Sequence, residues 1–270
     1  MIDNFVFKGN YNFNDLVYIM GLLRSDDGCP WDKEQTHNSI KKNFIEETYE
    51  VIEAINKEDS DLLKEELGDV LLQVVFHSQM ESENNIFNID DVCDGICKKL
   101  IERHPHVFGS TSVDNSKEVL SNWDKIKNVS KNHTKVSQRL TSIPKELPAL
   151  MRSSKIQQRV AQIGFDWDNV GGALSKLDEE VEELKSAIAK NDLDNAFEEL
   201  GDVLFASVNV SRFLECDAEE ALSQSSNKFI ARFTLLEDLA DQRGINLGEA
   251  SLESMDKLWE EAKKIILESR

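Results

Sequence analysis

The sequence has few residues that interrupt helices. Only 4 of its 270 residues are proline and 12 are glycine, and no segment alternates apolar and polar residues as a half-buried strand does. Apolar residues instead recur three and four positions apart over long segments, which is the period of an amphipathic helix. The sequence therefore predicts an all-α fold.

Cysteine is scarce too. The four cysteines form no C-x-x-C pair, and Cys93 and Cys97 are spaced like neighbours on one helix face. This pattern favours a reducing compartment over a disulfide scaffold. The start of the chain lacks the charged and apolar regions of a signal peptide, and no apolar run approaches the roughly 20 residues of a membrane helix. We expect a cytoplasmic protein that does not contact membranes.

Positive charge is the third shortage. Lysine and arginine total 31 against 51 aspartates and glutamates, which gives a formal net charge of −20. Such a surface repels nucleic acids and anionic membranes, so neither is expected as a direct partner. A nucleotide substrate remains compatible, because it can arrive with magnesium.

The sequence is rich in segments that predict helical hairpins, and residues 176–202 show this most clearly. Two segments with apolar residues at helical spacing flank Lys190-Asn191-Asp192. A cation suits the last turn of the first helix, Asn suits a left-handed residue, and Asp suits the N-cap of the second helix. We expect two antiparallel helices joined at Asn191.

Five acids of this hairpin fall on flanks that would face one groove. They are Glu179, Glu180 and Glu183 in the first helix and Glu199 and Asp202 in the second. Glu183 and Glu199 each lie eight residues from Asn191, so antiparallel packing brings them to the same height. Carboxylates gathered without histidine or cysteine suit a hard ion, magnesium or manganese. An acidic run alone, however, is more often a solvated helix face.

An internal repeat favours the metal site. A shift of 133 residues carries Glu46, Glu47, Glu50, Glu66 and Asp69 onto Glu179, Glu180, Glu183, Glu199 and Asp202. In both copies 15 residues (51–65 and 184–198) separate the third acid from an E-x-x-D motif. A solvated face has no reason to keep acid identity and spacing twice. We therefore interpret 46–69 as a second candidate site.

The repeat also sets the domain organisation. A shift of 136 carries Gly28-x-x-Trp31-Asp32, interpreted as a loop, onto Gly164-x-x-Trp167-Asp168. Later matches carry Lys99, Arg103 and Trp123 onto Lys228, Arg232 and Trp259. The pattern predicts an N-terminal repeat at 1–128, a polar linker at 129–142 and a C-terminal repeat at 143–270. Helices of the first repeat are expected at about 13–25, 38–56, 61–83, 89–103 and 116–128.

On these motifs, together with E-R-H-P-H-V-F-G at 102–109, the chain resembles the MazG family of tandem-domain nucleoside triphosphate pyrophosphohydrolases, within the all-α NTP pyrophosphatase superfamily. The resemblance implies a magnesium-dependent, dimeric enzyme of nucleotide-pool control that cuts NTPs or dNTPs into a monophosphate and pyrophosphate. It implies that Glu180, Glu183, Glu199 and Asp202 bind metal. It also implies nucleotide contacts at Lys176, Lys228, Arg232 and Trp259.

The sequence is compatible with two roles for several of these residues. Glu179 and the metal ligand Glu180 are the candidate catalytic residues. Glu179 is either the carboxylate that activates water or a second metal ligand. Lys228 and Arg232, one turn apart, form either a phosphate clamp or a pair of surface cations. Trp259 either stacks on a base or belongs to the core.

Other functions fit parts of this sequence pattern. A narrower dUTP-type or phosphoribosyl-ATP pyrophosphohydrolase uses similar acids, but the tandem copy and the Trp-Asp segments favour MazG. A di-iron protein needs two E-x-x-H motifs, and only Glu34 to His37 offers one. A non-catalytic helical regulator that binds nucleotide and metal without turnover is the third alternative.

The two repeats differ around their acids. Lys176 corresponds to Asn43, and Asn209 and Arg212 correspond to Phe76 and Gln79. The C-terminal repeat thus offers more groups to hold a triphosphate, so we expect it to be the active one and the N-terminal repeat to be weakly active or inactive. Apolar residues such as Val208, Val210 and Phe213 flank the groove, which predicts a homodimer that completes the helical bundle.

Overall fold

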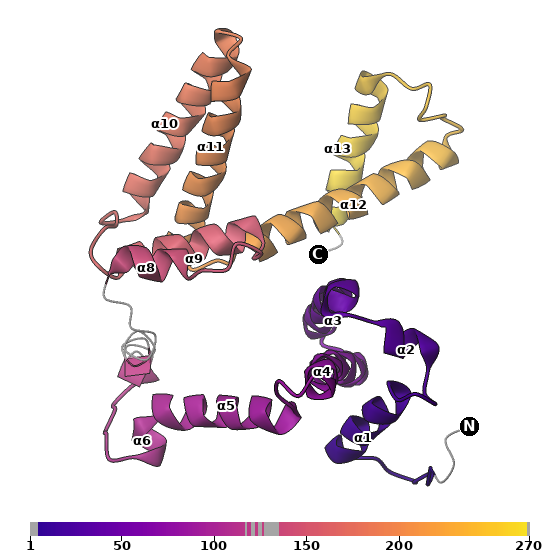
Figure 1. The fold of residues 1–270 in the computed structure, drawn as a ribbon. Coiled ribbons are helices and arrows are strands. Elements are labelled where there is room, and N and C mark those ends of the chain that lie inside the picture. The colour runs from indigo at the N-terminus through magenta and orange to yellow at the C-terminus, as the bar shows by residue number, and fades with distance from the viewer. Residues whose placement is uncertain (1–4, 117, 120–121, 124–125, 127–134, 269–270) are drawn as a thin grey trace. The chain divides into compact units, whose positions relative to one another are not determined.

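The computed structural model describes residues 5–116, 118–119, 122–123, 126 and 135–268, and throughout these residues the secondary structure is helical, without a strand (Figure 1). The chain divides into two compact units, 1–130 and 131–270. None of the described helices is both long and apolar enough to cross a membrane. The predicted all-α class is confirmed.

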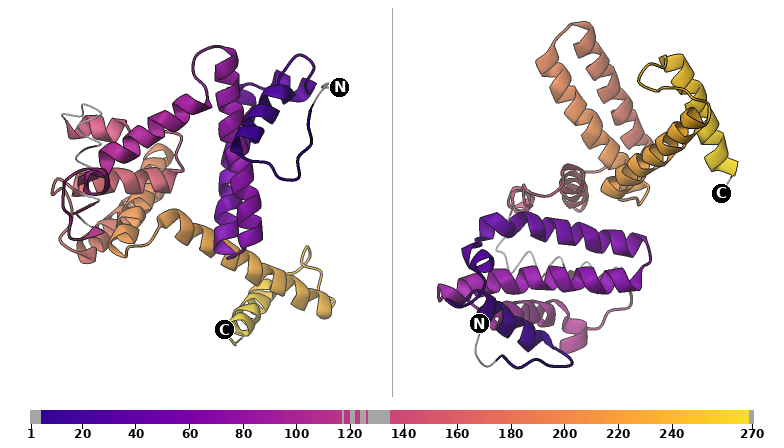
Figure 2. Two further views of the ribbon diagram at one scale, coloured as in Figure 1. Left: turned by 90° about the horizontal axis from the view of Figure 1, so that it is seen from below. Right: turned by 90° about the vertical axis from the view of Figure 1, so that its right-hand side faces the viewer.

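The first unit is built on a helical hairpin. Its helices are α1 (Phe13–Leu23), α2 (Pro30–Glu34), α3 (His37–Asn56), α4 (Ser60–Glu83), α5 (Ile89–Arg103) and α6 (Pro105–Phe108). The hairpin consists of α3 and α4, and α1 packs along α4 (Figure 2). Their buried side chains form one core of Met20, Ile40, Val75, Phe76 and Met80.

The second unit repeats this plan and extends it. Its helices are α8 (Val136–Thr141), α9 (Ala149–Ala161), α10 (Val170–Ala189), α11 (Leu193–Phe213), α12 (Ala218–Gln242) and α13 (Leu252–Glu268). The α10–α11 hairpin packs on α9, as α3–α4 packs on α1. A second hairpin, α12–α13, has its own core of Leu236, Leu239, Ala240, Leu258 and Ala262. The two hairpins extend from α9 as separate arms (Figure 1).

The turn between α10 and α11 has the predicted geometry. Asn191 is left-handed with φ 56°, and the Asp192 side chain caps α11 by accepting a hydrogen bond from the Asn195 amide at 3.2 Å. The first unit has the same turn, with Glu58 at φ 54° and Asp59 as the N-cap of α4. The hairpin expected at 176–202 is therefore confirmed, and its counterpart shares its local mechanism.

The segment Gly28–Asp32 is not wholly a loop, as the sequence had suggested. Pro30, Trp31 and Asp32 begin the short helix α2, in which Pro30 occupies the first turn. Proline suits this position because its fixed φ is helical and its missing N–H would have no partner there. The preceding helix, expected to reach residue 25, ends at Leu23 and is capped by Arg24.

Two other expected segments fall partly outside the described residues. These are most of the helix expected at 116–128 and the first part of the linker expected at 129–142. The later part of that linker is helical, since α8 occupies 136–141. The Arg159 side chain of α9 donates a hydrogen bond to the Arg139 carbonyl of α8 and another to Ser142 Oγ, the latter at 3.0 Å, so these residues pack as part of the second unit.

Candidate metal and nucleotide site

Three carboxylates meet across the α10–α11 hairpin. Glu180 of α10 and Glu199 and Asp202 of α11 each offer an oxygen within 4.8 Å of the others. Glu180 is only 7% exposed. A buried carboxylate surrounded by others needs a cation nearby, because like charges and lost hydration both disfavour its ionised form.

Glu183 lies beside this group of three. Partial loss of hydration and the neighbouring carboxylate of Glu180 raise the pKa of Glu183, and the charge of Glu199 raises it further. The structure thus places Glu183 next to the three oxygens, although outside the 4.8 Å group itself. Two of the other predicted ligands, Glu180 and Glu199, therefore act on the pKa of Glu183.

A lysine one turn earlier on α10 supplies a cation. The Lys176 Nζ lies 2.7 Å from Glu180 Oε1 and 2.8 Å from Glu179 Oε1. These hydrogen bonds, first to Glu179 and then to Glu180, raise the pKa of Lys176. The Glu179 side chain is 57% exposed and lies outside the group of three, so it differs clearly from its neighbour Glu180.

The first unit contains a matching acid group. Glu47, Glu66 and Asp69 bring their oxygens within 4.8 Å of one another across α3 and α4. Loss of hydration, followed by the charges of Asp69 and Glu50, raises the pKa of Glu47. The pKa of Glu66 is raised in the same way, with Glu50 as the larger charge effect. Glu46, like its counterpart Glu179, is exposed and outside the group.

The two acid groups differ in their cations. Asn43 occupies the position of Lys176 in the repeat. The ion pairs that lysine and arginine form within the described residues of the first unit involve other acids, and none includes Glu47, Glu66 or Asp69. The N-terminal group therefore carries the same repulsion without a neutralising side chain.

The remaining predicted nucleotide contacts lie on the other hairpin. Arg232 of α12 sits over the Trp259 ring of α13, with its guanidinium carbon 5.9 Å from the ring centroid. Phe229 packs against the same ring at 5.0 Å. Among the described residues of the second unit, no hydrogen bond or ion pair links Lys228 or Arg232 to the acids. One chain therefore does not bring these cations to the acid group.

Asn209 and Arg212, expected to hold a triphosphate, have a different environment. The Arg212 guanidinium forms an ion pair with Asp166, with one contact of 2.8 Å from Nη1 to Oδ2. Its Nη2 also donates to the Asn209 Oδ1 at 2.9 Å. Sequence reasoning missed Asp166 and the neighbouring Gln157, although the Gly-x-x-Trp-Asp repeat pointed to the segment that contains Asp166.

The acid group suits a hard divalent cation. Its donors are all carboxylate oxygens from rigid helices, and one of them is buried, which fits the oxygen ligands that magnesium and manganese prefer. Loss of hydration and then the neighbouring Glu180 and Glu199 raise the pKa of Glu183, and a cation at this position would lower that pKa.

Comparison with known proteins agrees with the repeat. The MazG nucleotide pyrophosphohydrolase domain matches residues 35–108 and again 172–235. These two segments contain both sets of five acids but not α9, residues 164–167 or α13.

Relatives align over nearly the whole chain. The nucleoside triphosphate pyrophosphohydrolase/pyrophosphatase MazG of Thermotoga maritima is 46% identical over 251 residues, 93% of this chain and 95% of that protein. The nucleoside triphosphate pyrophosphohydrolase of Escherichia coli K12 is 44% identical over 252 residues, 92% of this chain and 96% of that protein. The uncharacterized protein YabN of Bacillus subtilis is 47% identical over 94% of this chain but only 52% of its own length.

Proposed function

The chain belongs to the MazG family, and on that premise we propose that it hydrolyses nucleoside triphosphates to nucleoside monophosphates and pyrophosphate at the acid group of its second unit. The observation that carries this proposal is the meeting of Glu180, Glu199 and Asp202 within 4.8 Å, with Lys176 directly beside them. Two helices hold these groups, so the site is organised before any substrate arrives.

The acid group would hold magnesium, or manganese, through Glu180, Glu183, Glu199 and Asp202. Bound there, the ion supplies neutralisation of the phosphate charge and makes water more acidic. The helical hairpin contributes the fixed positions of the carboxylates, which determine where the phosphates can lie.

Glu179 would be the residue that activates water. It is exposed, and it lies outside the group of three oxygens while adjoining Glu180 in the chain. In the proposed reaction Glu179 accepts a proton of the attacking water as the water oxygen bonds to the α- or the β-phosphorus. The bond from that phosphorus to the oxygen that bridges the α- and β-phosphates breaks. The bridging oxygen then leaves with the other of these two phosphates. Lys176, now within 2.8 Å of Glu179, would turn to a phosphate oxygen.

A homodimer would complete the site. Large apolar side chains of the α10–α11 hairpin are exposed, among them Phe197 at 82% and Leu193 at 73%. Large apolar side chains exposed on a helical hairpin are candidates for a surface that a further chain covers. The separate α12–α13 arm of a second copy could bring Lys228 and Arg232 to the phosphates, with Trp259 holding Arg232 in place.

The N-terminal acid group is proposed to be weakly active or inactive. It has the carboxylates of Glu47, Glu66 and Asp69. Asn43, however, stands where the second unit has Lys176, which offsets the charge of the acids there and would hold a phosphate. Metal binding there would contribute to stability more than to turnover.

The reaction type is tested by the products. Purified full-length protein with an NTP and magnesium should yield NMP and pyrophosphate, identified by phosphorus NMR and anion chromatography. Formation of NDP and orthophosphate would refute the proposed bond cleavage. Nucleotide binding without turnover, with either magnesium or manganese, would instead favour a regulatory protein.

A further inference from the structure

A cavity of about 400 Å³ lies next to the acid-bearing hairpin in the second unit. It is formed by α9, residues 164–167 and α11, and its lining includes Gln157, Val160, Phe165, Trp167, Phe205 and Asn209. Most of its wall is apolar or aromatic, and a few amide groups lie among these side chains. Cavities of this size and character are typical small-molecule sites.

The cavity is aligned with the acid group. Asp202 and Asn209 are seven residues apart on α11, close to two helical turns, so they face the same side about 10 Å apart. Trp167 packs against Gly172 of α10, where an added Cβ would lie 2.9 Å from the ring, and Gly172 precedes Glu180 on that helix. The carboxylates and the cavity thus lie along the same two helices, and their separation on α11 is comparable to the span between phosphate and base in an extended nucleotide.

The cavity contains an unsatisfied hydrogen-bond acceptor. Gln157 is only 4% exposed, and its Nε2 donates to the Phe205 carbonyl at 2.8 Å. Its Oε1 is buried and has no hydrogen-bond partner among the described residues. Since buried polar atoms are rarely left unpaired, this oxygen indicates a missing donor that a ligand would supply.

A donor stands nearby. The Asn209 Oδ1 accepts hydrogen bonds from Arg212, through Nε at 3.2 Å and Nη2 at 2.9 Å, and Arg212 is itself held by Asp166. These contacts fix the amide, so the Asn209 Nδ2 is left to donate. An acceptor and a donor beside exposed aromatic rings match the edge and face of a nucleobase.

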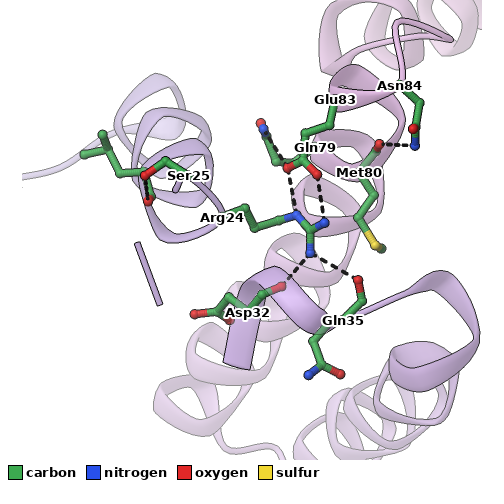
Figure 3. A network of polar contacts seen from close by, with 9 residues as sticks. Arg24, Ser25, Asp32, Gln35, Gln79, Met80, Glu83 and Asn84 are labelled. Carbon is green, nitrogen blue, oxygen red and sulfur yellow. Dashed lines mark hydrogen bonds and ion pairs between the residues drawn. The ribbon is translucent and has the colours of Figure 1, made fainter. Parts of the chain in front are cut away.

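The first unit shows how the same space is closed. Under the shift of 136, Arg24 of α1 takes the place of Val160. Its side chain is 7% exposed and binds Glu83 through two hydrogen bonds of 2.8 Å. It also donates to the carbonyl of Gln35 at 3.2 Å and to that of Asp32 (Figure 3).

Two further substitutions reinforce that closure. Phe76 replaces Asn209 and is 4% exposed, with the Arg24 guanidinium 5.3 Å from its ring centroid. Gly21 replaces Gln157, so the acceptor is also lost. The first unit therefore keeps the carboxylates but fills the adjoining space with its own side chains.

We propose that the cavity of the second unit binds the nucleoside part of the triphosphate. The base packs against Phe165 and Trp167, and its edge donates to Gln157 Oε1 and accepts from Asn209 Nδ2. This inference rests on the proposed function for the identity of the substrate. It assigns base recognition to α9 and the 164–167 segment, which lie outside the part of the chain that matches the family domain, together with Asn209, which lies inside it.

The first test compares three variants of the full-length protein. Gln157→Leu and Asn209→Leu should each raise the KM for an NTP at least tenfold while kcat changes less than threefold, because binding is lost equally in the ground and transition states. Gln73→Leu is the matched control, since Gln73 in the first unit is also buried with an unpaired Oε1, and it should leave KM within twofold. Values of KM within twofold for all three variants would overturn the proposal.

The second test needs no turnover. A nucleoside monophosphate added to the protein in EDTA should quench tryptophan fluorescence in the Trp259→Phe variant but not in Trp167→Phe. The opposite pattern would place the base on α13 and refute the pocket. Quenching at Trp167 in a protein without pyrophosphohydrolase activity would reject the proposed function and leave the pocket supported. Thermal unfolding of each variant verifies that it is folded.

Discussion

The Lys176 ammonium lies 2.7 Å from Oε1 of Glu180, the most buried carboxylate of the C-terminal acid group. The lysine therefore occupies the place of a counter-ion, and a divalent cation must compete with it for Glu180. The same hairpin in the first unit has Asn43 at this position and retains its acids. This one contact distinguishes the two groups electrostatically.

Replacing Lys176 should strengthen metal binding and weaken substrate binding. Lys176→Gln removes a positive charge next to the acids, so Mn²⁺ affinity should rise roughly threefold, the effect of a charge pair near a surface. The KM for an NTP should rise in the same variant, because a phosphate contact is lost. Mn²⁺ titration by electron paramagnetic resonance and steady-state kinetics measure the two effects. Lys185→Gln, which removes an exposed pair with Glu182, is the control, and reduced Mn²⁺ affinity in Lys176→Gln would contradict the account.

Repulsion among the acids should make the metal-free site destabilising. Asp202→Asn removes one like charge. In EDTA the melting temperature of this variant should therefore be at least that of the wild type, with an increase of up to about 2 °C, which corresponds to about 0.5 kcal/mol. Millimolar magnesium should raise the melting temperature of the wild type through preferential binding to the folded state, and raise that of the variant much less. Differential scanning calorimetry measures both. A variant that is markedly less stable in EDTA would show that Asp202 has a structural role instead.

Arg24 should stabilise the first unit in a pH-dependent way. Arg24→Met leaves two carbonyls and Glu83 without their buried donor and should lower the free energy of unfolding by about 2 kcal/mol at pH 7. Hydrogen bonds from Arg24 lower the pKa of Glu83 in the folded protein, so this part of the stability is present above the unfolded pKa and is lost as pH falls through the folded value.

Denaturant unfolding from pH 7 down to pH 3 tests this. The difference between wild type and Arg24→Met should shrink below about pH 4.5, the ordinary value for a glutamate. Arg243→Met, which removes an exposed pair with Glu261, should cost little at any pH. An equal cost for the two variants would contradict the buried network of Figure 3.

The exposed apolar side chains of the α10–α11 hairpin should be buried in a homodimer. Light scattering should give about twice the 30.7 kDa chain mass. Phe197→Asp should produce monomers and lower turnover, since the dimer would bring Lys228 and Arg232 to the site. Phe7→Asp is a matched change at a residue that is 86% exposed in the first unit and should alter neither property. A fully active wild-type monomer would refute the shared site.

The local structure could be predicted from the sequence because its signals are local. The left-handed Asn191 and the capping Asp192 define the hairpin, and the helical period places acids on facing flanks. The internal repeat predicted a second hairpin with a second set of acids in the first unit. The helix at Pro30 was missed because its single turn is too short to show a period.

The cavity could not be predicted, because tertiary packing creates it. Gln157 appears on α9 as an ordinary polar residue, and only its burial against Phe205 shows the unpaired oxygen. Arg212 was interpreted as a phosphate contact, but Asp166, 46 residues earlier, engages it. Likewise, the spacing of Lys228 and Arg232 gave no indication that they lie on a separate arm from the acids.

We propose that the second acid group performs the hydrolysis. Four single variants, assayed for pyrophosphate release under one saturating NTP, test it most directly. Glu180→Gln and Asp202→Asn should each lower turnover at least a hundredfold, because the remaining carboxylates cannot fix the ion's geometry. Glu47→Gln and Asp69→Asn, the same changes in the first unit, should retain at least a third of wild-type turnover. An N-terminal pair as damaging as the C-terminal pair would contradict the account.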